Sequence, residues 1–154
     1  MAGRGLTYGP VRATRPDEET FGDDSLRVLR AIQFAARFEF MLDDATAAIC
    51  RRIPLDDLPA ERIWGEIEKL LLQAGRPSIG FALALDLGVV EQVLPEMTPL
   101  VGCEQEPEWH PEGDVFTHTQ HCLDALAALG EWQASEAGRR RMLMFAVLGH
   151  DFGK

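Results

Sequence analysis

Hydrophobic residues recur at helical spacing along most of this chain. The clearest case begins at Leu26, after which Leu29, Ile32, Ala36 and Phe40 follow on one side of a helix. No segment alternates cleanly between apolar and polar residues, which is the pattern of a half-buried strand. We therefore predict an all-α fold with no sheet of consequence.

Seven helices are expected, separated by proline, glycine and polar residues. In chain order they cover residues 26–40, 42–53, 58–72, 77–87, 89–97, 115–129 and 139–149, and Pro95 is expected to break the fifth. Residues 1–20 are rich in glycine, proline and charge and are predicted to form a loop or tail. The stretch from 98 to 113 carries three prolines and is predicted to be a polar loop.

The start of the first helix combines carboxylates with arginines. Asp23 and Asp24 stand where an N-cap belongs, and Arg27, Arg30 and Arg37 fall on one side. Asp24 and Arg27 are three residues apart and so share a face. A carboxylate beside a guanidinium offers an acceptor and donors together, as recognition of a base edge requires. The alternative is a capping aspartate beside a solvated arginine.

The run Gly-Asp-Asp-Ser-Leu-Arg-Val-Leu-Arg-Ala at residues 22–31 resembles the Glu-Asp-x-x-Arg motif of bacterial tRNA nucleotidyltransferases. These are the CCA-adding enzymes, with the related poly(A) polymerases. The resemblance implies that Asp24 and Arg27 bind the Watson–Crick edge of CTP or ATP and that tRNA is a partner. It further implies RNA phosphate contacts from Arg30 and Arg37. Asp23 stands where the motif has glutamate.

The same family carries a catalytic head domain before this helix, with an Asp-x-Asp pair that holds catalytic metal ions. No Asp-x-Asp occurs ahead of the helix here. Phosphoryl transfer needs metal ions to neutralise charge on the moving group, Mg²⁺ in the intact family. We therefore expect residues 1–20 to end a missing head, residues 21–97 to form the helical neck, and no residue to catalyse nucleotidyl transfer.

Within the third expected helix, Arg62 and Glu66 resemble the family's Glu-Arg-x-x-x-Glu element in the neck. The resemblance implies that the two residues brace the nucleotide-reading helix. An ordinary ion pair between positions four apart is the alternative.

All four histidines lie between residues 110 and 150. His118 is expected near the start of one helix, and His150 with Asp151 ends an apolar helix. Nitrogen and oxygen ligands in this combination suit Mn, Fe, Ni, Co or Zn. Alternatively, Asp151 only orients His150 or caps a helix.

The surrounding sequence resembles the HD domain of metal-dependent phosphohydrolases, as carried by many bacterial tRNA nucleotidyltransferases. That resemblance implies that His118, His150 and Asp151 are metal ligands and that residues 98–154 are the N-terminal part of a truncated HD domain. The family's last ligand, a later aspartate, is not present. His110, His121 and Asp114 are given no ligand role.

Composition narrows the possible partners. The net charge is −10, which disfavours a simple nucleic-acid coat protein. Residues 1–76 hold 11 Lys and Arg against 13 Asp and Glu, whereas residues 77–154 hold 4 against 12, so RNA contacts are expected in the first half.

Three isolated cysteines suit reduced thiols in the cytoplasm and receive no role. No apolar run is long enough to cross a membrane, and a homodimer is one expected way to cover an exposed HD core.

The resemblance implies a fragment of an enzyme that adds or repairs CCA at tRNA 3′ ends, although poly(A) synthesis shares the same helix motif. Two alternatives come from other classes. One is a stand-alone HD phosphohydrolase with a helical extension, and the other is a non-enzymatic helical RNA-binding module.

Overall fold

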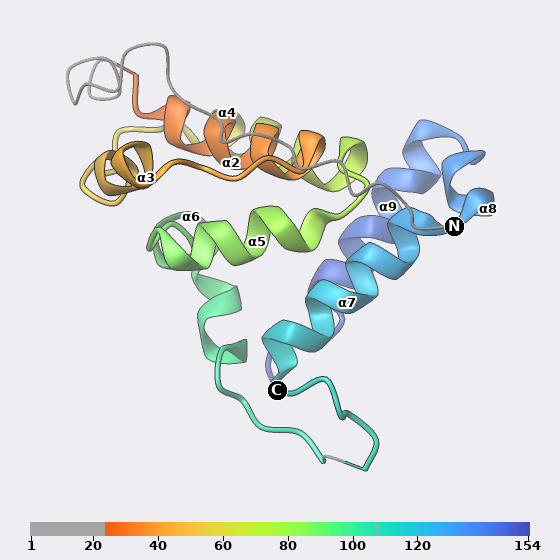
Figure 1. Ribbon diagram of the computed structural model, residues 1–154. Coiled ribbons are helices and arrows are strands. Elements are labelled where there is room, and N and C mark those ends of the chain that lie inside the picture. Colours follow the sequence, from red (N-terminus) through yellow and green to blue (C-terminus); the bar gives the residue numbers. More distant parts are fainter. Residues whose placement is uncertain (1–23, 107) are drawn as a thin grey trace, which may run out of the picture.

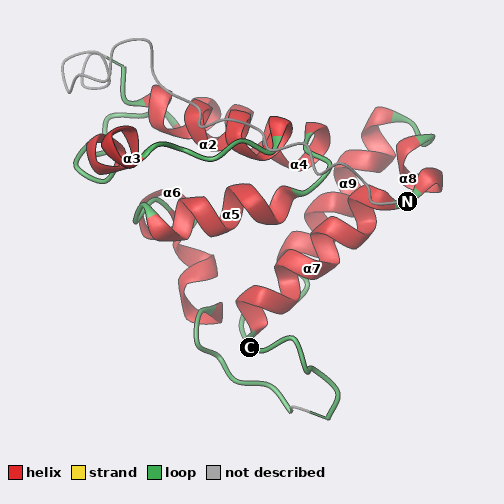
Figure 2. Ribbon diagram, in the orientation of Figure 1, coloured by secondary structure: helices red, strands yellow, loops and turns green. Residues whose placement is uncertain are grey.

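The computed structural model describes residues 24–106 and 108–154, so the predicted tail at 1–20 lies outside the described residues. Every regular element in this part of the chain is a helix (Figure 2), which confirms the all-α prediction. The helices are α2 (Leu26–Phe38), α3 (Asp44–Cys50), α4 (Ala60–Gln73), α5 (Pro77–Asp86), α6 (Val90–Val93), the 3₁₀ helix η1 (Pro95–Leu100), α7 (Val115–Ala128), α8 (Gly130–Gln133) and α9 (Ala137–Gly149).

Most predicted helices agree with these bounds to within a few residues. The segment 89–97, in which Pro95 was expected to break the helix, is not one continuous helix. It is divided between α6 and η1 at Leu94, whose φ of −140° and ψ of 57° are not helical. Leu94 precedes Pro95, and the proline ring disfavours a helical conformation in the residue before it. The short helix α8 was not predicted.

The N-terminus of α2 differs from the expected aspartate cap. Ser25 is the N-cap residue, and its hydroxyl donates to the Asp57 carboxylate at 2.7 Å. The carboxylate of Asp24 is instead held by an arginine described below, and Asp23 lies outside the described residues. A capping role for Asp24 was therefore wrong, because Ser25 occupies the N-cap position and the Asp24 carboxylate pairs with another helix.

Helix α2 packs against α4 and α5 (Figure 1). The closest approach is at Gly80 on α5, where an added Cβ would collide with the Leu70 side chain and lie 3.2 Å from the Cβ of Ala36. Glycine thus allows α5 to lie directly against both neighbours. The arrangement fixes the buried side of α2 and leaves its opposite side to solvent.

The second part of the chain packs on the first without a break in the core. Helix α7 lies against α5, and α9 lies against both α7 and α4 (Figure 1). The Asp124 carboxylate on α7 accepts hydrogen bonds from the Ser78 amide at 2.9 Å and hydroxyl at 2.6 Å. Arg140 on α9 donates to the carbonyl of Leu72 at 2.9 Å. One buried apolar cluster therefore spans both sides of the expected boundary at residue 97.

Among the described residues, no helix is both long and apolar enough to span a membrane.

Candidate functional site

One candidate site is the solvent side of α2. Arg27, Arg30 and Arg37 are all exposed and follow one another along this side, as their spacing predicted. Asp24 precedes them and is half-exposed. Gln33, which lies between the arginines in sequence, is instead buried, with 3% of its surface exposed. The exposed face is therefore cationic with one carboxylate at its N-terminal end.

Arg62 on α4 reaches that carboxylate. Its guanidinium lies 3.3 Å from the Oδ1 of Asp24. Glu66, one turn further along α4, is buried and pairs with Lys69 at 2.7 Å. These partners differ from the Arg62–Glu66 pair that the spacing suggested. Arg62 thus connects α4 directly to the residue that the motif assigns to base recognition.

Aromatic rings line the C-terminal half of the same face. Phe34 and Phe38 stack with centroids 5.9 Å apart, and Phe38 is 44% exposed. The guanidinium of Arg30 lies 5.9 Å from the Phe34 ring, and that of Arg37 lies 5.2 Å from the Phe38 ring. Planar cations and aromatic rings side by side suit the stacking of unpaired bases as well as phosphate contacts.

A second candidate site lies where the N-terminal half of α7 meets the end of α9. Asp114 caps α7 by accepting from the Thr117 amide at 2.8 Å, and it also accepts from the Gly102 amide at 2.7 Å. Burial alone would raise the pKa of Asp114, but these hydrogen bonds lower it overall. The cap fixes the first turn of α7 and with it the position of His118.

Glu112 orients His118. Its carboxylate lies 2.5 Å from the Nδ1 of His118 and 3.2 Å from the Nδ1 of His110. Hydrogen bonds from its own backbone and then from His118 lower the pKa of Glu112 to about 2. Because an ionised carboxylate only accepts, the Nδ1 of His118 carries a proton and its Nε2 lies on the opposite side of the ring.

His150 faces His118 from the end of α9, with ring centroids 5.5 Å apart. Its Nδ1 lies 2.6 Å from the Val147 carbonyl, which can only accept, so Nδ1 is the protonated nitrogen. Its Nε2 lies 3.4 Å from the Oδ2 of Asp151. Asp151 is buried and also pairs with Lys154 at 3.0 Å.

These donors fit a metal ion. His118 and His150 each use Nδ1 for a hydrogen bond, and an ion would bind their Nε2 atoms, which now lie beside the Cys122 sulfur and the Asp151 carboxylate. Asp151 contacts His150, but it is not among the three side chains (His118, Cys122 and His150) whose ligand atoms lie within 4.8 Å of one another. Sequence reasoning placed His118, His150 and Asp151 here, and the structure brings the two imidazoles together.

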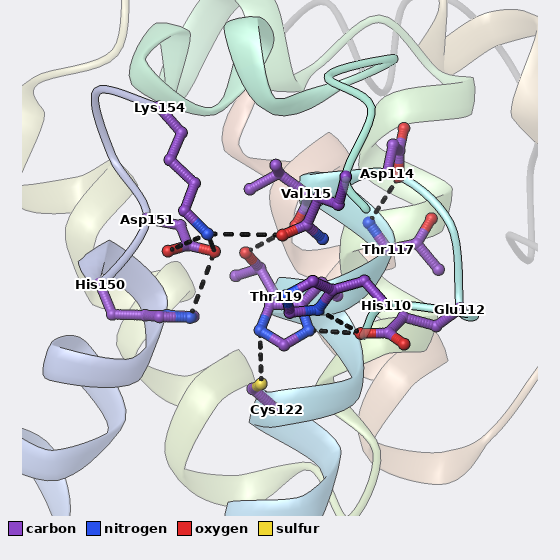
Figure 3. A network of polar contacts seen from close by, with 12 residues as sticks. His110, Glu112, Asp114, Val115, Thr117, Thr119, Cys122, His150, Asp151 and Lys154 are labelled. Atoms are coloured by element: carbon purple, nitrogen blue, oxygen red, sulfur yellow. Dashed lines mark hydrogen bonds and ion pairs between the residues drawn. The ribbon is translucent and has the colours of Figure 1, made fainter. Parts of the chain in front are cut away.

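Three other members of this cluster were missed or set aside: His110, Glu112 and Cys122. His110 and Glu112 come from the loop before α7 (Figure 3), where no periodicity predicts a position. Cys122 lies one helical turn after His118, and that spacing was a signal available in the sequence. His121, by contrast, is exposed.

The structure thus presents an all-helical segment with an exposed cationic face on α2. A family model described as a probable RNA and SrmB-binding site of polymerase A matches residues 40–100. The chain is 39% identical to the multifunctional CCA protein of Chromobacterium violaceum over 140 residues, 88% of this chain and 32% of that protein. It is 39% identical to the Halorhodospira halophila protein of the same name over 94% of this chain and 34% of the relative.

The chain belongs to the family of CCA-adding enzymes and poly(A) polymerases. It spans about a third of the length of the curated relatives that it matches. No solved structure matches it.

Proposed function

We propose that this segment binds tRNA and selects the incoming nucleotide during CCA addition or repair at tRNA 3′ ends. The observation that carries the proposal is the Arg62–Asp24 ion pair at the head of an exposed arginine stripe. Asp24 and Arg27 supply the acceptor and donors for the Watson–Crick edge of CTP or ATP. The proposed setting is the cytoplasm, where tRNA is found.

The contacts around Asp24 support a reading role. A carboxylate that must accept from a base needs a fixed position, and Arg62 holds Asp24 from a neighbouring helix. Arg27 is exposed one turn along α2. Glu66 is buried on α4, about one turn after Arg62, and its carboxylate pairs with Lys69 within the same helix. Arg62 therefore braces the nucleotide-reading residue, and the Glu66–Lys69 pair stabilises the helix that carries Arg62.

Nucleotidyl transfer itself is assigned to no residue of this segment. In the proposed whole enzyme Mg²⁺ would neutralise charge on the transferred group. This chain's residues orient the base and hold the tRNA end.

The RNA-binding part of the proposal predicts the salt dependence of binding. Replacing Arg30 and Arg37 by alanine is expected to weaken binding of a tRNA that lacks its terminal CCA. Each lost phosphate contact lowers the slope of log affinity against log salt by about 0.7–0.9. Filter binding across a salt series measures both quantities. Arg139→Ala removes one positive charge from an exposed position on α9, away from this face, and should leave the slope unchanged. Equal slopes for the double variant and the unchanged chain would contradict the assignment.

The facing imidazoles favour a second activity, metal-dependent phosphoester hydrolysis by an HD-type site. His118, His150 and Asp151 would hold a divalent transition ion, which when bound polarises a phosphate and activates water. Glu112 and the Val147 carbonyl hold the two imidazole rings in the required orientation. Failure of the chain to take up any such ion through His118 would contradict this second proposal.

A further inference from the structure

We propose that Cys122 is a ligand of the ion held by His118 and His150, and that the site therefore selects a zinc-class metal. This inference rests on the proposed metal site of the second activity and extends it to a residue and a metal class. On binding, the sulfur exchanges its proton for a metal–sulfur bond, and that proton passes to solvent.

The geometry of α7 and α9 places three donors around one point. His118 and Cys122 are four residues apart on α7 and so share a face. The Sγ of Cys122 lies 3.5 Å from the Nε2 of His118. Figure 3 shows Cys122 and His150 pointing from their two helices toward the same space. One ligand atom from each of the three residues lies within 4.8 Å of both others.

The distance between His118 and Cys122 matches what a tetrahedral ion requires. Zinc binds sulfur at about 2.3 Å and imidazole nitrogen at about 2.0–2.1 Å, so the two donors stand about 3.5 Å apart around it. The observed Nε2–Sγ distance is 3.5 Å. The pair needs little movement to accept an ion between its members.

Both histidines are already in the tautomer that ligation requires. Glu112 engages the Nδ1 of His118, and the Val147 carbonyl engages the Nδ1 of His150. Each Nε2 lone pair is thus directed away from its hydrogen bond, and in the metal-free chain the Cys122 thiol donates to the Nε2 of His118. Hydrogen bonds to the nitrogen that does not bind the metal commonly orient metal-bound histidines.

The donor set decides the metal. Two imidazoles and a thiolate favour Zn²⁺ or Co²⁺, whereas Mg²⁺ and Mn²⁺ prefer oxygen ligands. The three donors that lie within 4.8 Å of one another do not include Asp151, so the fourth position around the ion stays open to Asp151 or to water. An open hollow lined by Leu143, Ala146 and Val147 adjoins Cys122 and His150 and gives that position access to solvent.

Cobalt titration of the metal-free full chain tests the proposal, because thiolate ligation produces a near-ultraviolet sulfur-to-cobalt charge-transfer band. The band is expected in the unchanged chain and in Cys103→Ser, a half-buried thiol outside the cluster. It should be absent from Cys122→Ser and Cys122→Ala, whose folds are checked by circular dichroism. Both substitutions are expected to lower the affinity for Co²⁺ by at least about 10- to 100-fold, which is the loss seen when a residue that hydrogen-bonds to a metal ligand is removed. Added Zn²⁺ should abolish the band.

The possible outcomes distinguish failure of the Cys122 ligand from failure of the whole metal site. Cobalt uptake that His118→Ala abolishes but that lacks the sulfur band would overturn the Cys122 ligand and leave the histidine site standing. A band that persists in both Cys122 variants would assign the sulfur to another cysteine and overturn the inference. No uptake by the unchanged chain would overturn the inference and the metal site together.

Discussion

Replacing Phe81 by alanine is expected to lower the free energy of unfolding by about 3–5 kcal/mol. Phe81 lies on α5 with 1% of its surface exposed and belongs to the largest fully buried side chains. Helix α5 packs against α2 and is itself covered by α7, so the lost ring leaves a cavity that neighbouring helices cannot readily fill. Urea unfolding followed by circular dichroism measures the change.

Phe38→Ala is the matched control, since the same ring is removed from a side chain that is 44% exposed. Its expected cost is about 0.5–1.5 kcal/mol, the range for losing its aromatic stacking with Phe34, and so well below that of Phe81. A cost below about 1 kcal/mol at Phe81 would contradict the central position of α5. That position matters for function because α5 supports the buried side of α2, the helix proposed to read the nucleotide.

Replacing Arg27 by alanine is expected to reduce nucleotide addition by about 5- to 150-fold in kcat/KM. A bidentate contact to a base edge contributes about 1–3 kcal/mol, which corresponds to that range. The measurement uses a hybrid in which this chain replaces the matching segment of the Halorhodospira halophila relative. Incorporation of CTP and of ATP into tRNA lacking CCA is followed separately, and both should fall.

Arg27→Lys distinguishes charge from geometry in the same hybrid. Lysine keeps the positive charge but lacks the planar fork of donors that matches a base edge, so its activity should stay well below that of arginine. Full activity of the lysine variant would show that Arg27 acts only as a charge. Full activity of the alanine variant would remove Arg27 from the site.

The sequence predicts the helices better than it predicts their ends. The apolar spacing from Leu26 gives α2 correctly because that face is buried along its whole length. Its cap is Ser25, however, since a tertiary contact with Asp57 stabilises the serine there. Helix α2 ends at Glu39 with a φ of 52°, a left-handed conformation that apolar spacing does not reveal. Contacts between distant segments therefore decide the boundaries.

The two candidate sites were predictable to different degrees. The arginine stripe follows from helical spacing alone, because all its members lie on one helix. The partner of Asp24 is on α4, 38 residues away, and no local pattern identifies it. The histidine cluster combines one helix, the end of another and a preceding loop, so Glu112 enters it only through the fold. Cys122 was passed over because a single cysteine more often packs as a small apolar residue.

Amide chemical shifts of the isotopically labelled chain, recorded as a tRNA acceptor stem without CCA is added, show which face binds the RNA. Shifts are expected at Asp24, along the exposed side of α2 through Phe38, and at Arg62 on α4. Shifts confined to α7 and α9, or the absence of any shift at saturating RNA, would contradict the assignment of α2 as the face that receives the tRNA end.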